Sequence, residues 1–214
     1  MTLKGVAWVV GAYLAGTLPS TYLIARARGG TEVLRLSARR ESQADAHILM
    51  DKHMGKAWAA AAATLDVLKG LLPPLVAREL GNVSPEWVAA AGVAAVVGHG
   101  WPPYVRAMAG RGLSTAVGVL LGLLPVGAVA LGVIIVMGFV LRLTGPASTL
   151  GFVAVPVIEG LRGQPAAYVW MSIVILLVVF ARRIEGITAV VRSGTPWPRA
   201  LYYRAVHDIS TPPD

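Results

Sequence analysis

GHGWPPYVRAMAGRGLST, residues 98–115, is a polar segment bracketed by glycines that separates two apolar runs. Its turn Ala109-Gly110-Arg111-Gly112 leads into an apolar helix that we expect to begin near Leu113. A glycine turn that opens a helix directs free backbone N–H groups toward one point, where the helix dipole favours an anion. Arg111 adds a permanently charged, planar group suited to phosphate or carboxylate. The segment predicts either a phosphate-binding site at a membrane surface or a cationic loop that only sets topology.

The composition is that of a membrane protein. The 214-residue chain is 56% hydrophobic and 14% charged, whereas soluble domains contain about 25% charged residues. Apolar runs extend along the whole chain, so we expect one polytopic unit without a separate soluble domain. The 19 Lys and Arg gather at the ends of these runs, which positive-inside topology explains better than nucleic-acid binding. The absence of cysteine excludes disulfides and thiolate catalysis.

The expected fold class is all-α, with about seven transmembrane helices. Most of these helices are predicted from apolar runs of bilayer length. The first apolar run, 5–25, is long enough to be a retained membrane span, so we do not expect it to be a cleaved signal peptide. The uncharged run Leu113–Leu141 is too long for one span and contains the turn signal Leu124-Pro125-Val126-Gly127, so it divides in two. Further breaks are expected at Thr144-Gly145-Pro146 and after Arg182-Arg183. The expected spans are 5–25, 57–77, 87–98 (completed through 99–105), two short or tilted spans within 113–141 on either side of the turn at 124–127, 147–158 and 166–181.

The distribution of cations predicts the orientation. With the C-terminus inside, the segments between spans place only Lys4, Arg78 and Arg162 outside, while Lys69 lies within a span and the other cations lie inside. The positive-inside rule then places the N-terminus outside and the C-terminus in the cytoplasm. We expect residues 1–191 to form a single bundle in the cell inner membrane and residues 192–214 to form a tail on its cytoplasmic surface.

Two polar features interrupt the apolar spans. Pro19, followed by Ser20 and Thr21, predicts a kink whose freed carbonyl groups need polar partners.

Asp66 and Lys69 are three residues apart, so they share a helix face and can pair. Charges at membrane depth usually face the protein interior. We favour a structural ion pair over a functional role for these two residues.

Four polar segments on the predicted cytoplasmic side can converge on a shallow pocket, and they are 39–56, 99–115, 142–148 and 182–185. Such a pocket would be cationic, would carry hydroxyl groups and would lie beside lipid tails. That chemistry suits phosphorylated, lipid-linked substrates.

The histidines leave several interpretations open. His99 is either a general base or a helix-end histidine that bonds a backbone carbonyl. His47 and His53 lie in the first loop with Asp45 and Asp51, but metal binding would need a tighter and more complete set. Walker, dinucleotide and Gly-x-Ser-x-Gly motifs are absent from the sequence. No metal and no cofactor are expected.

Three sequence motifs occur in a fixed order: Gly16-Thr17-Leu18-Pro19 with Tyr22-Leu23-Ile24-Ala25, then Leu65-Asp66-Val67-Leu68-Lys69-Gly70, then Gly98-His99 with Pro102 and 109–115. They resemble the G-S-I-P…Y-L-I-A, L-D-x-L-K-G and G-H-x-x-P…G-G-K-G-x-A-T motifs of the bacterial acyl-phosphate:glycerol-3-phosphate acyltransferases of the PlsY type. The similarity extends from about Gly16 to Gly194. It implies a small inner-membrane enzyme of seven helices.

The chain departs from this family at polar positions. The first-loop motif G-S-G-N-x-G-x-T-N falls on 41–49, where only Ser42 matches, and Arg111 replaces the lysine of the glycine-rich motif. A further family motif, which contains two serines, falls near residues 145–148. Gly145 stands where the family has the first serine, while Ser148 matches the second serine. The family's H-R-E-N falls on residues 183–186, which read Arg-Ile-Glu-Gly. The departures therefore concern the residues expected to perform the chemistry.

The resemblance implies acyl transfer from acyl phosphate to the 1-hydroxyl of glycerol 3-phosphate, giving lysophosphatidic acid. Arg111 would hold a substrate phosphate, Ser42 would donate a hydrogen bond and His99 would orient the glycine-rich turn, so these three are the expected catalytic residues. The expected substrate-binding residues are Gly110, Gly112, Ser114, Thr115, Ser148, Arg142, Arg183 and Glu185. Membrane lipid is the surrounding partner, and no protein partner follows from the sequence.

Two alternatives remain beside this interpretation. The loss of glycine and asparagine from the first loop favours a non-catalytic relative that acts as a membrane scaffold or partner subunit. Arg39, Arg40 and Arg183 would instead suit an acyltransferase that recognises another, larger phosphorylated acceptor. A transporter fits less well because the mid-membrane charges are almost confined to Asp66 and Lys69.

Overall fold

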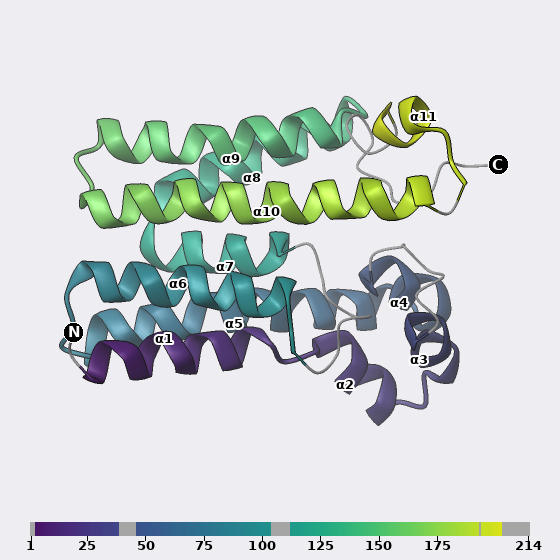
Figure 1. Cartoon of the computed structure of the whole chain (residues 1–214), viewed down its shortest axis with the longest axis horizontal. Coiled ribbons are helices and arrows are strands. Elements are labelled where there is room, and N and C mark those ends of the chain that lie inside the picture. Colours follow the sequence, from purple (N-terminus) through teal and green to yellow (C-terminus); the bar gives the residue numbers. More distant parts are fainter. Residues whose placement is uncertain (1–2, 39–45, 104–111, 193, 203–214) are drawn as a thin grey trace.

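The computed structural model describes residues 3–38, 46–103, 112–192 and 194–202, and within these ranges every regular element is a helix (Figure 1). The expected all-α class is confirmed. The helices are α1 (Leu3–Gly16), α2 (Ser20–Ala27), α3 (Thr31–Ala38), α4 (Ala46–Met54), α5 (Lys56–Leu80), α6 (Pro85–Gly100), α7 (Leu113–Leu123), α8 (Pro125–Val140), α9 (Thr144–Leu161), α10 (Ala166–Arg192) and α11 (Trp197–Tyr202).

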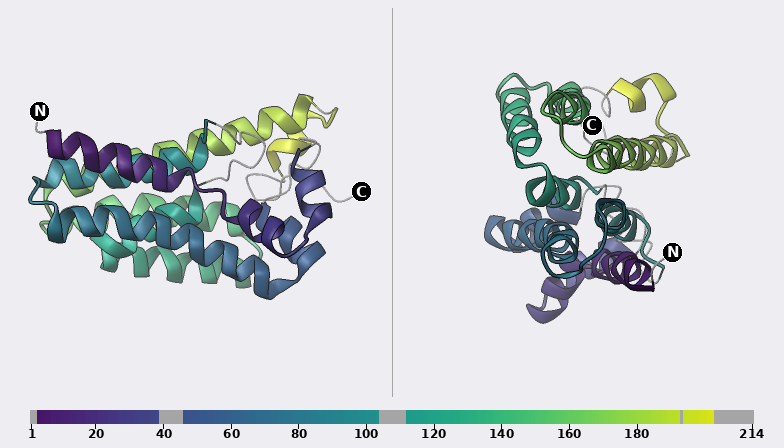
Figure 2. Two further views of the ribbon diagram at one scale, coloured as in Figure 1. Left: turned by 90° about the horizontal axis from the view of Figure 1, so that it is seen from below. Right: turned by 90° about the vertical axis from the view of Figure 1, so that its left-hand side faces the viewer.

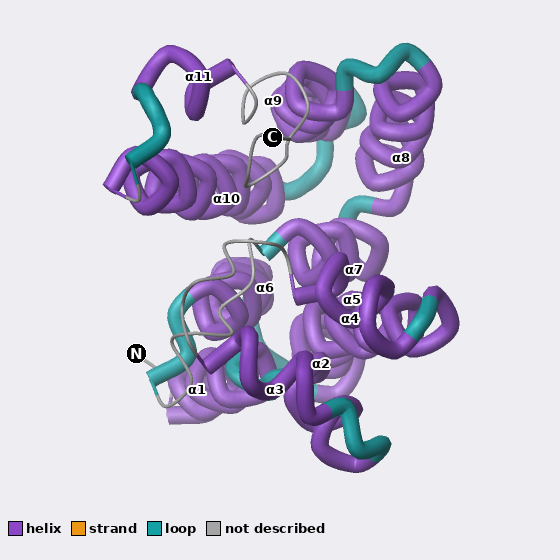
Figure 3. Tube along the Cα trace, turned by 90° about the vertical axis from the view of Figure 1, so that its right-hand side faces the viewer, coloured by secondary structure: helices purple, strands orange, loops and turns teal. Residues whose placement is uncertain are grey.

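The long helices run side by side and form two packed groups. One group contains α1, α5, α6 and α7, and the other contains α8, α9 and α10 (Figures 1 and 2). Helix α10 also packs against α6 and α7, which joins the two groups. The short helices α2, α3, α4 and α11 gather at one end, opposite the start of α1 (Figure 3). The short helices that follow α1 and α10 therefore lie at a single end of the bundle.

Several expected boundaries agree with the structure. Helices α1 and α2 are bent by 47° across the break that contains Pro19, as the proline predicted. The run Leu113–Leu141 divides at Leu124, which separates α7 from α8. Pro125 is the first residue of α8, where a missing N–H costs nothing because no intrahelical acceptor exists there.

Two expected boundaries are wrong. Thr144-Gly145-Pro146 is not a break but the first turn of α9, where Pro146 needs no intrahelical partner for its nitrogen. Arg182-Arg183 does not end the last long helix, because α10 continues to Arg192. An ion pair between Arg182 and Glu185, three residues apart on one helix face, supports this continuation.

Helices α5 and α10 are each long and apolar enough to cross a membrane among the described residues, and the bent pair α1 and α2 is a third candidate. Helices α7 and α8 are apolar but shorter. One face of α8 carries exposed large side chains, including Val129, Val136 and Phe139, which is 75% exposed. An apolar face of this kind suits contact with lipid tails.

Glycines allow a close contact between α5 and α7. A Cβ at Gly118 of α7 would overlap the carbonyl of Val67 on α5, and a Cβ at Gly70 of α5 would overlap the carbonyl of Thr115 on α7. The two backbones therefore touch directly, as small residues permit in membrane helix bundles. This contact fixes the start of α7 against the middle of α5.

A buried carboxylate holds the start of α8 at the far end of the bundle. The backbone N–H of Gly127 donates to Glu159 Oε1 at 2.6 Å, and Glu159 is only 1% exposed. Arg162, one turn further along the chain, places its Nε 3.3 Å from the other carboxylate oxygen. Glu159 thereby satisfies one of the amino-terminal N–H groups that α8 leaves unpaired.

We predict that Gly118→Ala destabilises the protein because the new methyl group must push α7 away from α5. The expected loss is about 1–3 kcal/mol, which is typical of overpacking. The matched control is Gly132→Ala on α8, where nothing lies within 4 Å of the added Cβ. The midpoint of thermal unfolding in detergent should fall for Gly118→Ala and stay level or rise slightly for the control. An equal response of the two variants would contradict the direct backbone contact.

Candidate functional site

The break between α1 and α2 forms one wall of the site. Pro19 precedes α2 with φ −86° and ψ 81°, so the chain leaves helical geometry there. The carbonyl of Leu18 lies between the two helices, and Lys69 of α5 donates a hydrogen bond to it at 2.7 Å. The kink thus finds the polar partner that a proline break needs in an apolar setting.

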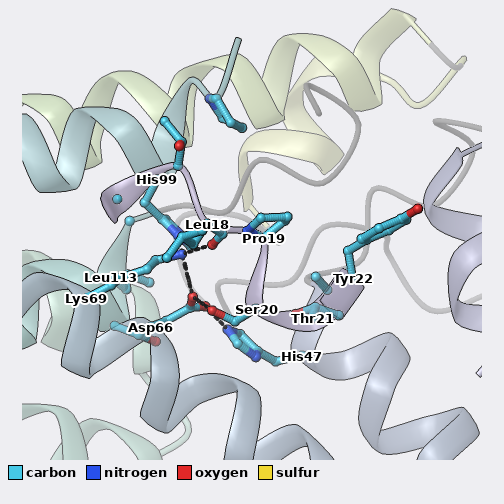
Figure 4. A pocket seen from close by; sticks show the side chains of 16 residues that line it. Leu18, Pro19, Ser20, Thr21, Tyr22, His47, Asp66, Lys69, His99 and Leu113 are labelled. Atoms are coloured by element: carbon cyan, nitrogen blue, oxygen red, sulfur yellow. Dashed lines mark hydrogen bonds and ion pairs between the residues drawn. The ribbon is translucent and has the colours of Figure 1, made fainter. Parts of the chain in front are cut away.

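Asp66 is the centre of a polar cluster that we call the Asp66 cluster: Ser20, His47, Asp66, Lys69 and His99 (Figure 4). Its Oδ1 accepts a hydrogen bond from Ser20 Oγ at 2.7 Å and lies 2.6 Å from Lys69 Nζ. Its Oδ2 lies 3.0 Å from His47 Nε2, and His99 Nδ1 is 3.8 Å from Oδ1. One carboxylate therefore joins residues of α2, α4, α5 and α6.

Asp66 and Lys69 are both buried, with 3% and 8% of their surfaces exposed. Burying two charges is costly unless they are paired and also hydrogen-bonded. Here the ammonium has two acceptors, Asp66 and the Leu18 carbonyl, for its three N–H groups. The third N–H has no acceptor among the described residues. The expected ion pair is confirmed, and it lies in the wall of a pocket.

The pocket lies where the middle of α5 and the end of α6 meet the break after α1 and the start of α7. Its volume of about 90 Å³ is several times the roughly 10–15 Å³ that one water needs by the same measure. The lining residues are Gly16, Thr17, Leu18, Pro19, Ser20, Thr21, Tyr22, Ala46, His47, Asp66, Lys69, His99, Pro102, Gly112, Leu113 and Ser114. All three motifs of the family resemblance contribute to this lining.

The start of α7 faces the same pocket. Gly112 precedes the helix with φ 81°, a left-handed conformation that favours glycine, and no side chain caps the helix in the described part of the chain. Gly112, Leu113 and Ser114 line the pocket. The helix start near Leu113 is confirmed, and uncapped N–H groups beside a buried ammonium make this region suited to an anion.

Three further residues form a second polar cluster between α9 and α10. The guanidinium of Arg183 donates to Ser148 Oγ at 2.8 Å and to Thr149 Oγ1 at 2.7 Å. Ser148 is 6% exposed and also donates to the carbonyl of Gly145. The structure therefore brings together Ser148 and Arg183, two of the residues expected to bind substrate, but neither lines the pocket.

Glu185 links α10 to the end of α6. Trp101 donates from its indole Nε1 to Glu185 Oε1 at 3.2 Å, and Arg182 pairs with the other carboxylate oxygen. The guanidinium of Arg182 also lies over the Trp101 ring, 5.3 Å from its centre. These contacts hold the point from which the chain leaves α6 toward residues 104–111.

The other expected residues lie elsewhere. Thr115 is fully buried in the first turn of α7, and its hydroxyl has no partner among the described residues. Arg142 is exposed between α8 and α9, with φ 58°. Ser42, Gly110 and Arg111 lie outside the described residues. Of the expected catalytic residues, His99 is therefore the one that the structure places, and it lines the pocket.

Sequence reasoning missed two members of the Asp66 cluster. Ser20 was considered only as a residue after a proline kink, and His47 only as an incomplete metal ligand. A serine directly after a proline break is a recognisable signal for a polar partner. The approach of His47 to Asp66 has no local signal, because the two residues lie on separate helices.

The described residues thus form a helical membrane bundle with a polar pocket, lined by the Asp66 and Lys69 pair, at one end. The sequence profile of the family described as glycerol-3-phosphate acyltransferase matches residues 6–193. The chain belongs to this family. The resemblance noted in the sequence is confirmed.

Curated relatives match over most of their length. The glycerol-3-phosphate acyltransferase of Halalkalibacterium halodurans is 31% identical over 87% of this chain and 91% of the relative. That of Geobacter sulfurreducens is 34% identical over 86% of this chain and 92% of the relative. Among solved structures, the crystal structure of PlsY, an integral membrane glycerol 3-phosphate acyltransferase, in its glycerol 3-phosphate form superposes with a TM-score of 0.73. It is 25% identical, over 88% of this chain and 92% of PlsY.

We predict that Asp66→Ala destabilises the protein by about 3–5 kcal/mol because it leaves the Lys69 ammonium buried without its counter-ion. Adding Lys69→Met should recover much of the loss, since the double variant buries no unpaired charge. The control is Glu79→Ala, which breaks the exposed pair with Arg78 and should change little. Unfolding midpoints in detergent measure all three. No recovery in the double variant would argue against the pair as the source of the effect.

Proposed function

We propose that this chain transfers an acyl group from acyl phosphate to the 1-hydroxyl of glycerol 3-phosphate, producing lysophosphatidic acid and inorganic phosphate. The observation that carries the proposal is the pocket, where a buried ammonium lies beside the start of α7 in a member of the glycerol-3-phosphate acyltransferase family. Among the described residues, no side chain caps that helix start. Both substrates carry a phosphate group, and the pocket offers the donors and the positive charge that such a group needs.

The acyl transfer mainly requires that the two substrates are held in the correct relative position. The acyl phosphate is already activated, because phosphate is a good leaving group. The acceptor oxygen attacks the acyl carbon, the bond from that carbon to the phosphate oxygen breaks, and the hydroxyl proton leaves with the phosphate. Holding two phosphate-bearing molecules in line supplies much of the rate, and N–H or O–H donors directed at the developing oxyanion supply more.

The residue roles that we propose follow the motifs. Arg111 holds a substrate phosphate, Ser42 donates to a substrate oxygen and His99 orients the glycine-rich turn. The turn and the start of α7 contribute phosphate donors, and the cluster between α9 and α10 extends the anion-binding surface. The proposed substrate-binding residues are Gly110, Gly112, Ser114, Thr115, Ser148, Arg142, Arg183 and Glu185. No step in this scheme requires a metal or a cofactor.

The membrane arrangement that we propose has about seven spans in the cell inner membrane, the N-terminus outside and the pocket on the cytoplasmic side. The gathering of α2, α3, α4 and α11 at the pocket end supports it, as does the excess of Lys and Arg in the segments placed inside. Residues 1–191 then form the bundle and 192–214 a surface tail. Acyl chains reach the pocket from the surrounding lipid.

A second candidate function rests on the first loop, residues 41–49, where glycine and asparagine of the family motif are replaced. These changes favour a relative that keeps the bundle and has lost catalysis, acting as a scaffold or partner subunit. An enzyme that uses another phosphorylated acceptor is also consistent with them. Product formation separates these alternatives directly.

We predict that the purified protein in lipid vesicles converts palmitoyl phosphate and labelled glycerol 3-phosphate to labelled lysophosphatidic acid. Arg111→Ala should lower kcat/KM by about tenfold to a hundredfold or more, because a charged hydrogen bond to phosphate is lost. Arg111→Lys restores the family residue and should retain most activity. The control is Lys4→Ala, an exposed cation at the opposite end of α1.

Three results would contradict this assignment. A folded parent without product rejects the glycerol 3-phosphate reaction, and product with a different phosphorylated acceptor would then identify the other enzyme. An active parent whose Arg111→Ala variant is unchanged rejects the proposed role of Arg111. Equal losses in Arg111→Ala and Lys4→Ala would indicate a general charge effect.

A further inference from the structure

His47 is the second residue of α4, the helix that follows the first polar loop. Its Nε2 lies 3.0 Å from Asp66 Oδ2, and because a carboxylate only accepts, Nε2 carries the hydrogen. The other ring nitrogen, Nδ1, is buried and has no hydrogen-bond partner among the described residues. Within the described part of the chain, the contact with Asp66 is therefore what orients this imidazole.

Lys69 depends on the same carboxylate. Asp66 Oδ1 and the Leu18 carbonyl hold two of the three ammonium N–H groups, at 2.6 and 2.7 Å. The remaining N–H belongs to a residue that lines the pocket beside the first residues of α7. Rotation of the Asp66 carboxylate would remove one of the two anchors of the ammonium. His47 opposes this rotation because it holds the opposite oxygen.

We propose that His47 is a positioning residue for the reaction: through Asp66 it holds the Lys69 ammonium in place to bind the phosphate group of a substrate. The inference rests on the proposed acyltransferase function and adds to it a residue outside the matched motifs, since the aligned first-loop motif leaves position 47 open. Figure 4 shows the path from His47 through Asp66 to Lys69. The same contact ties the start of α4 to the pocket.

The test compares two substitutions of His47 in the full-length protein in lipid vesicles. His47→Gln keeps a side-chain N–H for Asp66, whereas His47→Phe keeps a planar ring and removes the donor. His53→Phe on the exposed last turn of the same helix is the matched control. KM is measured separately for glycerol 3-phosphate and for palmitoyl phosphate, together with kcat.

We expect His47→Phe to raise KM for one of the two substrates by about tenfold or more, because an ammonium–phosphate hydrogen bond is weakened. The value of kcat should change by less than about twofold, since binding is lost equally in the ground and transition states. His47→Gln and His53→Phe should resemble the parent. The substrate whose KM rises is the one whose phosphate lies on Lys69.

Unchanged KM values in His47→Phe would overturn the proposal, and so would equal impairment in His47→Gln, which would indicate ring packing alone. Inorganic phosphate provides a measurement that does not need turnover. It should raise the unfolding midpoint of the parent and of His47→Gln but not of His47→Phe, or of His47→Ala if the Phe variant does not fold. An inactive parent rejects the proposed function, and the phosphate shifts still decide the role of His47.

Discussion

The buried carboxylate of Asp66 is the constraint on which the rest of the pocket depends. An ionised group inside an apolar bundle is tolerated only when its charge and lone pairs are all satisfied. Lys69 supplies the charge, while Ser20 and His47 occupy the remaining positions on the two oxygens. Each of these partners comes from a different element or turn. Satisfying one carboxylate therefore fixes the start of α2, the start of α4 and the middle of α5 relative to one another.

Close helix packing explains why the pocket is located at the bundle end. Gly70 and Gly118 bring α5 and α7 into backbone contact, so the start of α7 lies directly beside Lys69 and Asp66. At the opposite end, Glu159 accepts one of the N–H groups at the start of α8. The starts of α7 and α8 therefore differ in whether a side chain accepts their free N–H groups. One is capped by a buried side chain, and the other has no side-chain cap in the described part of the chain and faces a cavity.

Membership in the family establishes the fold of this chain, whereas the residues of the site have partly changed. The profile match over residues 6–193 covers the helices that build the pocket, and the Asp66 and Lys69 pair is retained within a matching motif. The first loop has changed at nearly every matched position, and the aligned histidine and asparagine of the last motif are replaced. A shared fold does not by itself preserve a site. In this chain the contacts among Asp66, His47 and Lys69 show which polar connections the fold still makes.

Local signals in the sequence were sufficient to predict the all-α class, the helix breaks at Pro19 and Leu124, the start of α7 and the pairing of Asp66 with Lys69. All of these follow from local signals: apolar run length, proline and glycine chemistry, and helical spacing. The sequence did not reveal that α10 continues past Arg182, because cations end a span without ending a helix. The meeting of Ser20, His47 and His99 at Asp66, and the contact of Arg183 with Ser148, could be seen only once the helices were packed together. Those contacts join residues distant in the sequence, and they form because buried polar groups must find partners on whichever helix packs nearby.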